Sequence, residues 1–108
     1  MTPLTPAVFH ILLALAGGKR HGYAISKEVL RQTDGRMRMG PGTLYGTLQR
    51  LLDQGWVEAV DGPESADERR RYYQLTPLGL AVARAEAERL AGQLSTARAR
   101  RLLRGGPA

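Results

Sequence analysis

The sequence predicts a mainly α-helical domain with three short helices, then a β-hairpin, then one long helix. In the first half, three segments have apolar residues at helical spacing and are separated by glycine or proline. Two extended runs joined by a polar, turn-rich loop follow. The last segment has apolar residues spaced alternately by three and four positions. This order of elements is that of a winged helix-turn-helix followed by an association helix.

The first two helices are expected at residues 5–16 and 22–33. Thr5 is a suitable N-cap and Pro6 suits the first helical turn, while paired glycines end the first helix. Because the first helix is apolar on nearly every side, we expect it at the centre of the core. The second helix has one apolar side and one charged side, which is typical of a helix at the surface of a domain.

The third helix is expected at residues 41–54 and has an inner stripe of leucines. The side chains that we assign to its outer face are small or hydrogen-bonding, and none is acidic. Glycine and threonine permit close approach, arginine suits guanine and glutamine suits adenine, whereas a carboxylate would be repelled by phosphate. This face therefore predicts a helix that enters the major groove of double-stranded DNA. The DNA-binding residues predicted on it are Gly42, Thr43, Tyr45, Thr47, Gln49 and Arg50.

Each of these side chains also has a plainer interpretation. The ring of Tyr45 could pack on the first strand and expose only its hydroxyl group, and Thr43 could cap the helix or bond back to its own backbone. Arg50 could pair with Asp53 or Glu58. We favour DNA contact for Tyr45, since leucines already fill the inner stripe, and leave both interpretations open for the glutamine and the arginine.

Two strands are expected at residues 56–60 and 70–75, with a protruding loop between them. Three consecutive arginines lie where the loop meets the second strand. Alternate residues of a strand face opposite sides, so at most two of them point the same way, toward backbone phosphate or the minor groove. A solvated hairpin in which Asp67 and Glu68 pair with these arginines is the alternative. The wing residues predicted to bind DNA are Arg69, Arg70 and Arg71.

Further basic residues flank the third helix and add to a positive net charge. Arg36 and Arg38 come just before that helix and are predicted to bind DNA. His21 opens the second helix, where unpaired backbone amides could hold a phosphate, and it is predicted to bind DNA as well. The 16 Lys and Arg against 10 Asp and Glu give a net charge of +6, which favours a polyanionic partner. A basic surface that merely aids solubility is the alternative.

Composition argues against several classes of protein. There is no cysteine and there are only two histidines, so we expect no metal site and no cofactor. No nucleophile with a base, carboxylate pair or phosphate loop has plausible spacing, so we expect no enzyme. No apolar run approaches the roughly 18–20 residues that span a bilayer. The apolar stretch at 8–16 lacks the basic leader of a signal peptide, so we expect a cytoplasmic protein without membrane contact.

The last helix is expected to begin after Thr76 and to run to about residue 103. Its heptad-like seam is a stripe that a chain of 108 residues cannot easily cover, which predicts a homodimer. The first helix is the expected surface for the partner's last helix. The residues predicted to form the dimer are Leu80, Ala83, Ala87, Leu90, Leu94, Phe9 and Leu12. The expected divisions of the chain are a DNA-binding domain at 1–76, a dimerisation helix at 77–104 and a disordered tail at 105–108.

Four motifs stand in order along the chain, at residues 21–25, 41–45, 48–57 and 69–79. Together they resemble the motifs of short PadR-type transcriptional regulators. The resemblance implies a winged helix-turn-helix that binds DNA as a homodimer. Gly46 departs from the family pattern, which often has proline at this position. The last helix has no aromatic residue, so the flat drug-binding pore of some short members is not expected here.

The leading hypothesis is a sequence-specific DNA-binding transcriptional regulator, and more narrowly a repressor that binds a pseudo-palindromic operator as a homodimer. A small-molecule effector is one means of releasing it. The alternative from another class is a winged-helix module that binds proteins and not DNA. Acidic or apolar residues on the outer face of the third helix would favour that alternative, whereas threonine, glutamine and arginine favour DNA.

Overall fold

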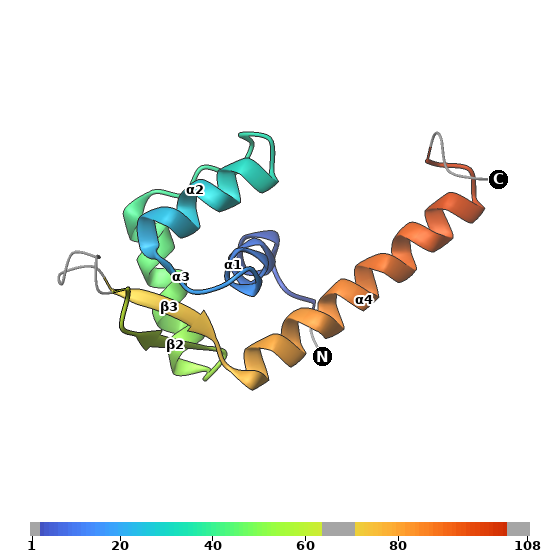
Figure 1. Ribbon diagram of the computed structural model, residues 1–108. Helices are drawn as coiled ribbons and strands as arrows, with labels where there is room; N and C mark the ends of the chain where they lie inside the picture. Colours follow the sequence, from blue (N-terminus) through green and yellow to red (C-terminus); the bar gives the residue numbers. More distant parts are fainter. Residues whose placement is uncertain (1–2, 64–70, 104–108) are drawn as a thin grey trace.

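The computed structural model describes residues 3–63 and 71–103. Within these residues it contains four α-helices and a three-stranded sheet (Figure 1). In chain order the elements are α1 (Pro6–Ala16), β1 (Arg20–His21), α2 (Gly22–Gln32), α3 (Pro41–Asp53), β2 (Val57–Val60), β3 (Tyr72–Leu75) and α4 (Pro77–Ala99). The order confirms the predicted winged helix-turn-helix with a long last helix.

The sheet has one strand more than the sequence predicted. Its order is β1-β3-β2, and both pairings are antiparallel. β1 pairs Arg20 with Tyr73 and His21 with Tyr72. Two residues are too few to show the alternation that identifies a strand in a sequence. Through this added strand, the wing is hydrogen-bonded directly to His21, the N-cap residue of α2.

The helix starts follow the predicted capping chemistry. The Thr5 side chain accepts a hydrogen bond from the Val8 amide at 3.2 Å, and the Thr76 side chain accepts one from the Gly79 amide at 3.0 Å. α3 stops where the chain must turn sharply, because Gly55 has a φ of +76° that favours glycine. The predicted N-caps of α1 and α4 are therefore confirmed.

The last helix ends at Ala99, earlier than the predicted end near residue 103. Arg101 adopts a left-handed conformation with a φ of 61°, and the Leu102 amide donates to the Ala97 carbonyl at 2.9 Å. This is the closing pattern of a helix C-terminus, in which a left-handed residue lets the next amide reach back across the last turn. Leucines beyond this point continue the apolar pattern, which is why the sequence suggested a longer helix.

α1 is the centre of the core, as predicted. It lies between the helix-turn-helix and the start of α4 (Figure 1), and it contacts α2, β3 and α4. Ile11 and Leu12 are fully buried. Each such side chain contributes about 1.5–3 kcal/mol relative to an exposed one. The other members of the buried cluster include Leu15, Ile25, Val29, Leu44, Leu48, Leu51, Val57, Tyr73 and Val82.

Two predicted dimer residues are in the core of their own chain, so these predictions are wrong. Leu12 is 0% exposed and Ala83 is 7% exposed. The sequence showed that both are apolar and on apolar stripes, but it did not show that α1 and α4 cover each other within one chain. On the opposite side of α1, Leu13 is exposed and Phe9 is half-buried.

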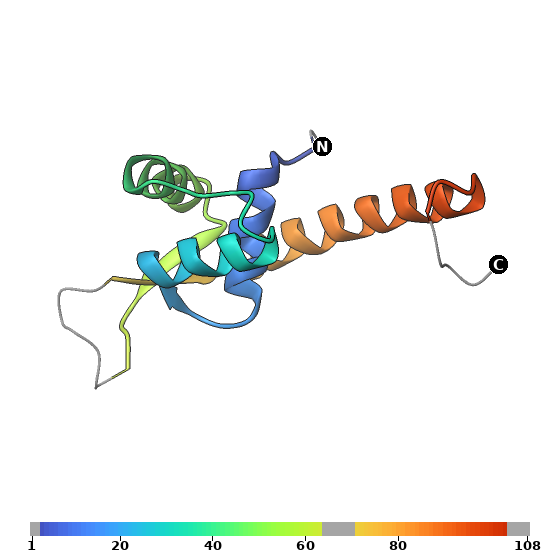
Figure 2. The same ribbon diagram turned by 90° about the horizontal axis from the view of Figure 1, so that it is seen from above.

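Only the first part of α4 packs on the domain. Its buried residues end at Glu86, and the rest of the helix extends away from the other helices (Figures 1 and 2). Despite this length, no helix in residues 3–63 and 71–103 is long and apolar enough to cross a bilayer.

Glu86 is a nearly buried carboxylate on α4. It is only 5% exposed, and its carboxylate accepts two hydrogen bonds of 2.7 Å from Arg89. The hydrogen bonds to Arg89 are the main reason why the pKa of Glu86 lies below its ordinary value.

Gly79 is predicted to be required for the joint between α4 and the turn after α3. A methyl group there would meet the backbone carbonyl of Trp56, which cannot move aside as a side chain could. We expect Gly79→Ala to lower the free energy of unfolding by about 1–3 kcal/mol, measured by urea denaturation. Gly92→Ala is the matched control, because its methyl group would enter open space in the same helix. The control should stabilise the chain by up to about 1 kcal/mol, and equal effects at both sites would contradict this role for Gly79.

Candidate nucleic-acid interface

The outer face of α3 is exposed over its whole length. Gly42 and Gly46 lie one turn apart on this face, and a methyl group at either would meet nothing within 4 Å. The exposed side chains Thr43, Gln49 and Arg50 also lie on this side of the helix. The result is a flat central strip bordered by polar groups, a shape that lets a groove edge approach the backbone.

Thr47 does not belong to this face, and its predicted DNA contact is wrong. It is 4% exposed, and its hydroxyl group donates to the Thr43 carbonyl at 2.7 Å. Thr47 is three residues after Leu44 and four before Leu51, so the helical period places it on the buried stripe. The backbone hydrogen bond allows a threonine to be buried there without an unpaired hydroxyl group.

The outer face of α3 ends in a carboxylate, which was not among the residues that we assigned to this face from the sequence. Asp53 is exposed one turn after Gln49, and its carboxylate accepts a hydrogen bond from the Gln49 side-chain amide at 2.9 Å. Gln49 is therefore held in place, with its amide already paired. The alternative pairing of Arg50 with Asp53 or Glu58 is not present among the described residues, since Glu58 pairs with Gln74 across the sheet at 2.6 Å.

Tyr45 lies between the two helices of the helix-turn-helix. Its side chain is 49% exposed, and the hydroxyl end of its ring rests against Gly22 at the start of α2. Any side chain at position 22 would collide with this ring. Tyr45 thus sets the spacing of α2 and α3 while keeping part of its ring open to solvent, so its DNA contact stays a prediction.

His21 caps the helix that it was predicted to open. Its Nδ1 accepts a hydrogen bond from the Ala24 amide at 3.1 Å. The ring stacks in parallel with Tyr23 at a centroid distance of 6.4 Å and meets Tyr72 edge-on at 5.4 Å. In the neutral form the hydrogen is consequently on Nε2. One of the amides expected to hold a phosphate is thus already paired, and phosphate contact by His21 stays a prediction.

The wing is described on both of its strands but not at its tip. Arg69 and Arg70 lie outside the described residues, so their predicted contacts stay predictions. Arg71 is exposed and lies just before β3. Burial raises the pKa of the Tyr73 hydroxyl group, and the nearby positive charge of Arg71 partly opposes this shift. The predicted DNA contact of Arg71 stays a prediction.

The connector between α2 and α3 brings Arg36 and Arg38 to the surface. Both side chains are exposed, while Met37 and Met39 between and after them pack against the core. This alternation turns the two arginines outward together. Within residues 3–63 and 71–103, no group of three or more potential metal ligands occurs.

α4 presents a second exposed surface, made of apolar side chains. Leu80 is 36% exposed and Leu94 is 52% exposed, Ala87 is exposed and Leu90 is half-buried. Sequence reasoning missed Leu13 of α1 and Leu78 of α4, which are 38% and 54% exposed. Apolar periodicity alone could not find these two, because it does not say which side of a nearly all-apolar segment meets the core.

Comparison with known families and proteins agrees with this arrangement. The model of the Transcriptional regulator PadR-like family matches residues 11–85, from α1 to the first part of α4. The chain is 38% identical over 77 residues to Transcriptional regulator Rv3488 of Mycobacterium tuberculosis, which covers 68% of this chain and 64% of that protein. It is 37% identical over 71 residues to protein X of Lysinibacillus sphaericus, which covers 66% and 65%. The match thus spans less than two thirds of each relative's length.

Solved structures share the fold. A transcriptional regulator from Clostridium thermocellum has a TM-score of 0.69 at 30% identity, with 84% of this chain and 88% of that chain covered. A PadR family regulator from Clostridium difficile has a TM-score of 0.72 at 20% identity, with 87% and 96% covered, and supports the fold alone. Because the family model spans most of the chain, from the core of α1 through the wing, the chain belongs to the PadR-like family of transcriptional regulators.

Proposed function

We propose that this chain is a repressor that binds a specific DNA sequence with α3 in the major groove and acts in the cytoplasm. The observation that carries this proposal is the exposed outer face of α3, where Gly42 and Gly46 leave open space between hydrogen-bonding side chains. The net charge of +6 supports a polyanionic partner. Arg36, Arg38 and Arg71 are all exposed and can contact phosphate beside the groove.

Selection of bound fragments from the organism's own genomic DNA tests this function directly. We expect a small set of fragments that share a sequence with two-fold symmetry and that lie near promoters. Occupancy of such a site would block transcription, which a reporter fused to the selected promoter would measure. Failure to retain any fragment at low salt would instead favour the protein-interaction module.

Gln49 is predicted to contribute sequence preference. We expect Gln49→Ala to weaken binding to the selected operator by about 1–3 kcal/mol and binding to random DNA by much less. Fluorescence anisotropy with both duplexes would measure this. Gln93→Ala, an exposed glutamine of α4, is the control and should change neither affinity. Equal losses on both duplexes would show that Gln49 only positions the protein.

Arg71 is predicted to contact phosphate and so to act on all sequences alike. If the protein neutralises one phosphate fewer, the slope of log affinity against log salt concentration should become smaller by about 0.9. We expect Arg71→Ala to show this smaller slope on operator and random DNA. Arg98→Ala, near the end of α4, should keep the slope of the unmodified chain. An unchanged slope in Arg71→Ala would remove this residue from the interface.

We further propose that two copies associate through the exposed part of α4. Ala87, Leu90 and Leu94 follow the helical period along one side, where Ala87 and Leu94 are exposed and Leu90 is half-buried. Phe9 and Leu13 of α1 offer apolar surface of the same kind. A two-fold dimer would place two α3 helices about one turn of DNA apart, roughly 34 Å, which fits a pseudo-palindromic operator.

Leu90→Asp is predicted to break this dimer. It would bring two carboxylates near the two-fold axis, one from each copy, where neither has a counter-ion. Sedimentation should then show a monomer, and operator affinity should fall because two half-sites no longer bind as one. Ser95→Asp adds the same charge on another side of the exposed helix and should leave the dimer intact. A dimer of unchanged strength in Leu90→Asp would contradict this assignment of α4.

A further inference from the structure

Asp53 and Gln49 form a polar pair at the end of the exposed face of α3. Oδ1 of Asp53 accepts a hydrogen bond of 2.9 Å from Nε2 of Gln49. Gly46 lies three residues before Gln49, and a methyl group there would meet nothing within 4 Å. Because residues three and four apart share one side of a helix, Gln49 is the first long side chain after the flat strip of Gly42 and Gly46.

Helix stability does not account for the carboxylate of Asp53. Asp53 is the last residue of α3, where the partial negative charge of a helix C-terminus disfavours an anion. Among the residues that the structure describes, no arginine or lysine forms an ion pair with it. A Gln–Asp pair four residues apart adds a little helix stability, which the unfavourable charge at this end offsets. DNA phosphates also repel a carboxylate, so its place on this face points to a role in recognition.

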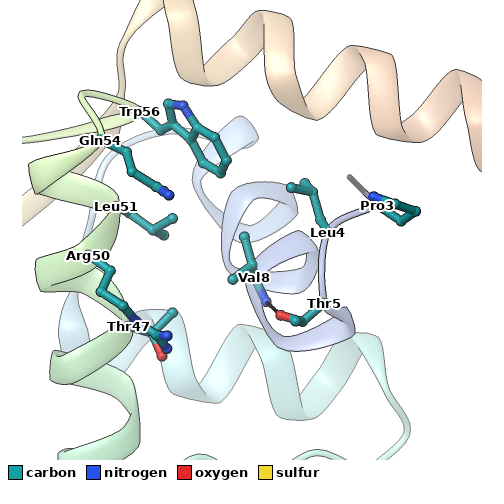
Figure 3. Close-up of a pocket in the computed structure, with 9 residues that line it drawn as sticks. All are labelled: Pro3, Leu4, Thr5, Val8, Thr47, Arg50, Leu51, Gln54 and Trp56. Atoms are coloured by element: carbon teal, nitrogen blue, oxygen red, sulfur yellow. Dashed lines mark hydrogen bonds between the residues drawn. The ribbon is translucent and has the colours of Figure 1, made fainter. Parts of the chain in front are cut away.

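Arg50, the other side chain suited to reading bases, is turned to a different side of α3. Figure 3 shows Arg50 and Gln54 on the side of the helix that faces the segment before α1. Both line a cavity of about 230 Å³ between that segment and α3. Gln49 precedes Arg50 by one residue, which rotates it by about 100° around the helix axis, and it does not line the cavity. This leaves Gln49 as the long neutral side chain on the exposed face.

A carboxylate only accepts hydrogen bonds, so it decides which end of the Gln49 amide turns toward it. Nε2 faces Asp53 and uses one of its two hydrogens there. The second hydrogen and the carbonyl oxygen Oε1 have no partner within the described residues. One donor beside one acceptor matches adenine, whose N7 accepts and whose N6 amino group donates in the major groove. Guanine presents two acceptors, N7 and O6, and would leave Oε1 facing another oxygen.

We propose that Asp53 is a specificity-determining positioning residue, which orients Gln49 to read one adenine in each half-site of the operator and to reject guanine there. This inference rests on the proposed function, because it needs α3 in the major groove. Oε1 of Gln49 accepts from adenine N6, and Nε2 donates to N7. Without Asp53 the amide can rotate, and both of its hydrogens can turn toward the two acceptors of guanine.

The test uses the full chain and the operator selected from genomic DNA. Each adenine of a half-site is replaced in turn by 7-deazaadenine, which pairs with thymine but lacks the N7 acceptor. We expect one position at which this change weakens binding by about 3- to 10-fold, since one hydrogen bond is lost. Replacing that A·T pair by G·C should weaken binding by about tenfold or more. Fluorescence anisotropy measures both ratios.

Four variants assign these ratios to the pair. Gln49→Ala should bind the adenine and 7-deazaadenine operators equally. Asp53→Ala should lose most of the preference for adenine over guanine and should bind random DNA more tightly, because a negative charge leaves the interface. Asp53→Glu keeps an acceptor at this position and should keep the preference. Glu88→Ala, which removes an exposed carboxylate from α4, is the control and should keep the preference of the unmodified chain.

The hydrogen bond itself can be measured without DNA. In a nitrogen–proton NMR spectrum, the side-chain amide signals of Gln49 are identified by their loss in Gln49→Ala. We expect Asp53→Ala to shift these signals and to leave those of Gln93, on α4, in place. An unchanged Gln49 signal would show that the two side chains are not paired, and would overturn the proposal before any DNA is added.

The DNA experiment overturns the proposal in any of three ways. Every 7-deazaadenine operator binds as the natural one does, Gln49→Ala stays sensitive to the change, or Asp53→Ala keeps the full preference for adenine. Each of these results leaves the proposed function standing, because the operator is still bound. A chain that retains no DNA fragment at low salt would overturn the proposed function, and this inference with it.

Discussion

The burial of α1 is the constraint on which the rest of the structure depends. A chain of this size can build one core, and Ile11 and Leu12 at its centre are fully buried. α2, β3 and α4 all contact α1. The orientation of the helix-turn-helix and that of the long last helix are therefore fixed to the same element, and a change in the position of α1 would act on both exposed surfaces.

The same constraint divides α4 into a part that packs on the domain and a part that does not. Up to Glu86 the helix gains stability by packing on α1, whereas none of its residues beyond Glu86 is buried by the described part of the chain. A free helix of fewer than about 12–15 residues is only marginally stable in water. The exposed part of α4 therefore gains the most from apolar contact with another surface, and Leu94, at 52% exposure, is the side chain with most to gain.

Periodicity and capping predicted the order of the elements and most of their ends, because those signals are local. Thr5 and Thr76 cap the helices that they were expected to cap. Features that depend on partners distant in sequence or on the width of a buried stripe were missed. The strand at residues 20–21 exists only because β3 lies beside it, and Thr47 is buried because its hydroxyl group finds a carbonyl one turn back. Sequence alone could not show that Gln49 pairs with Asp53 instead of remaining free.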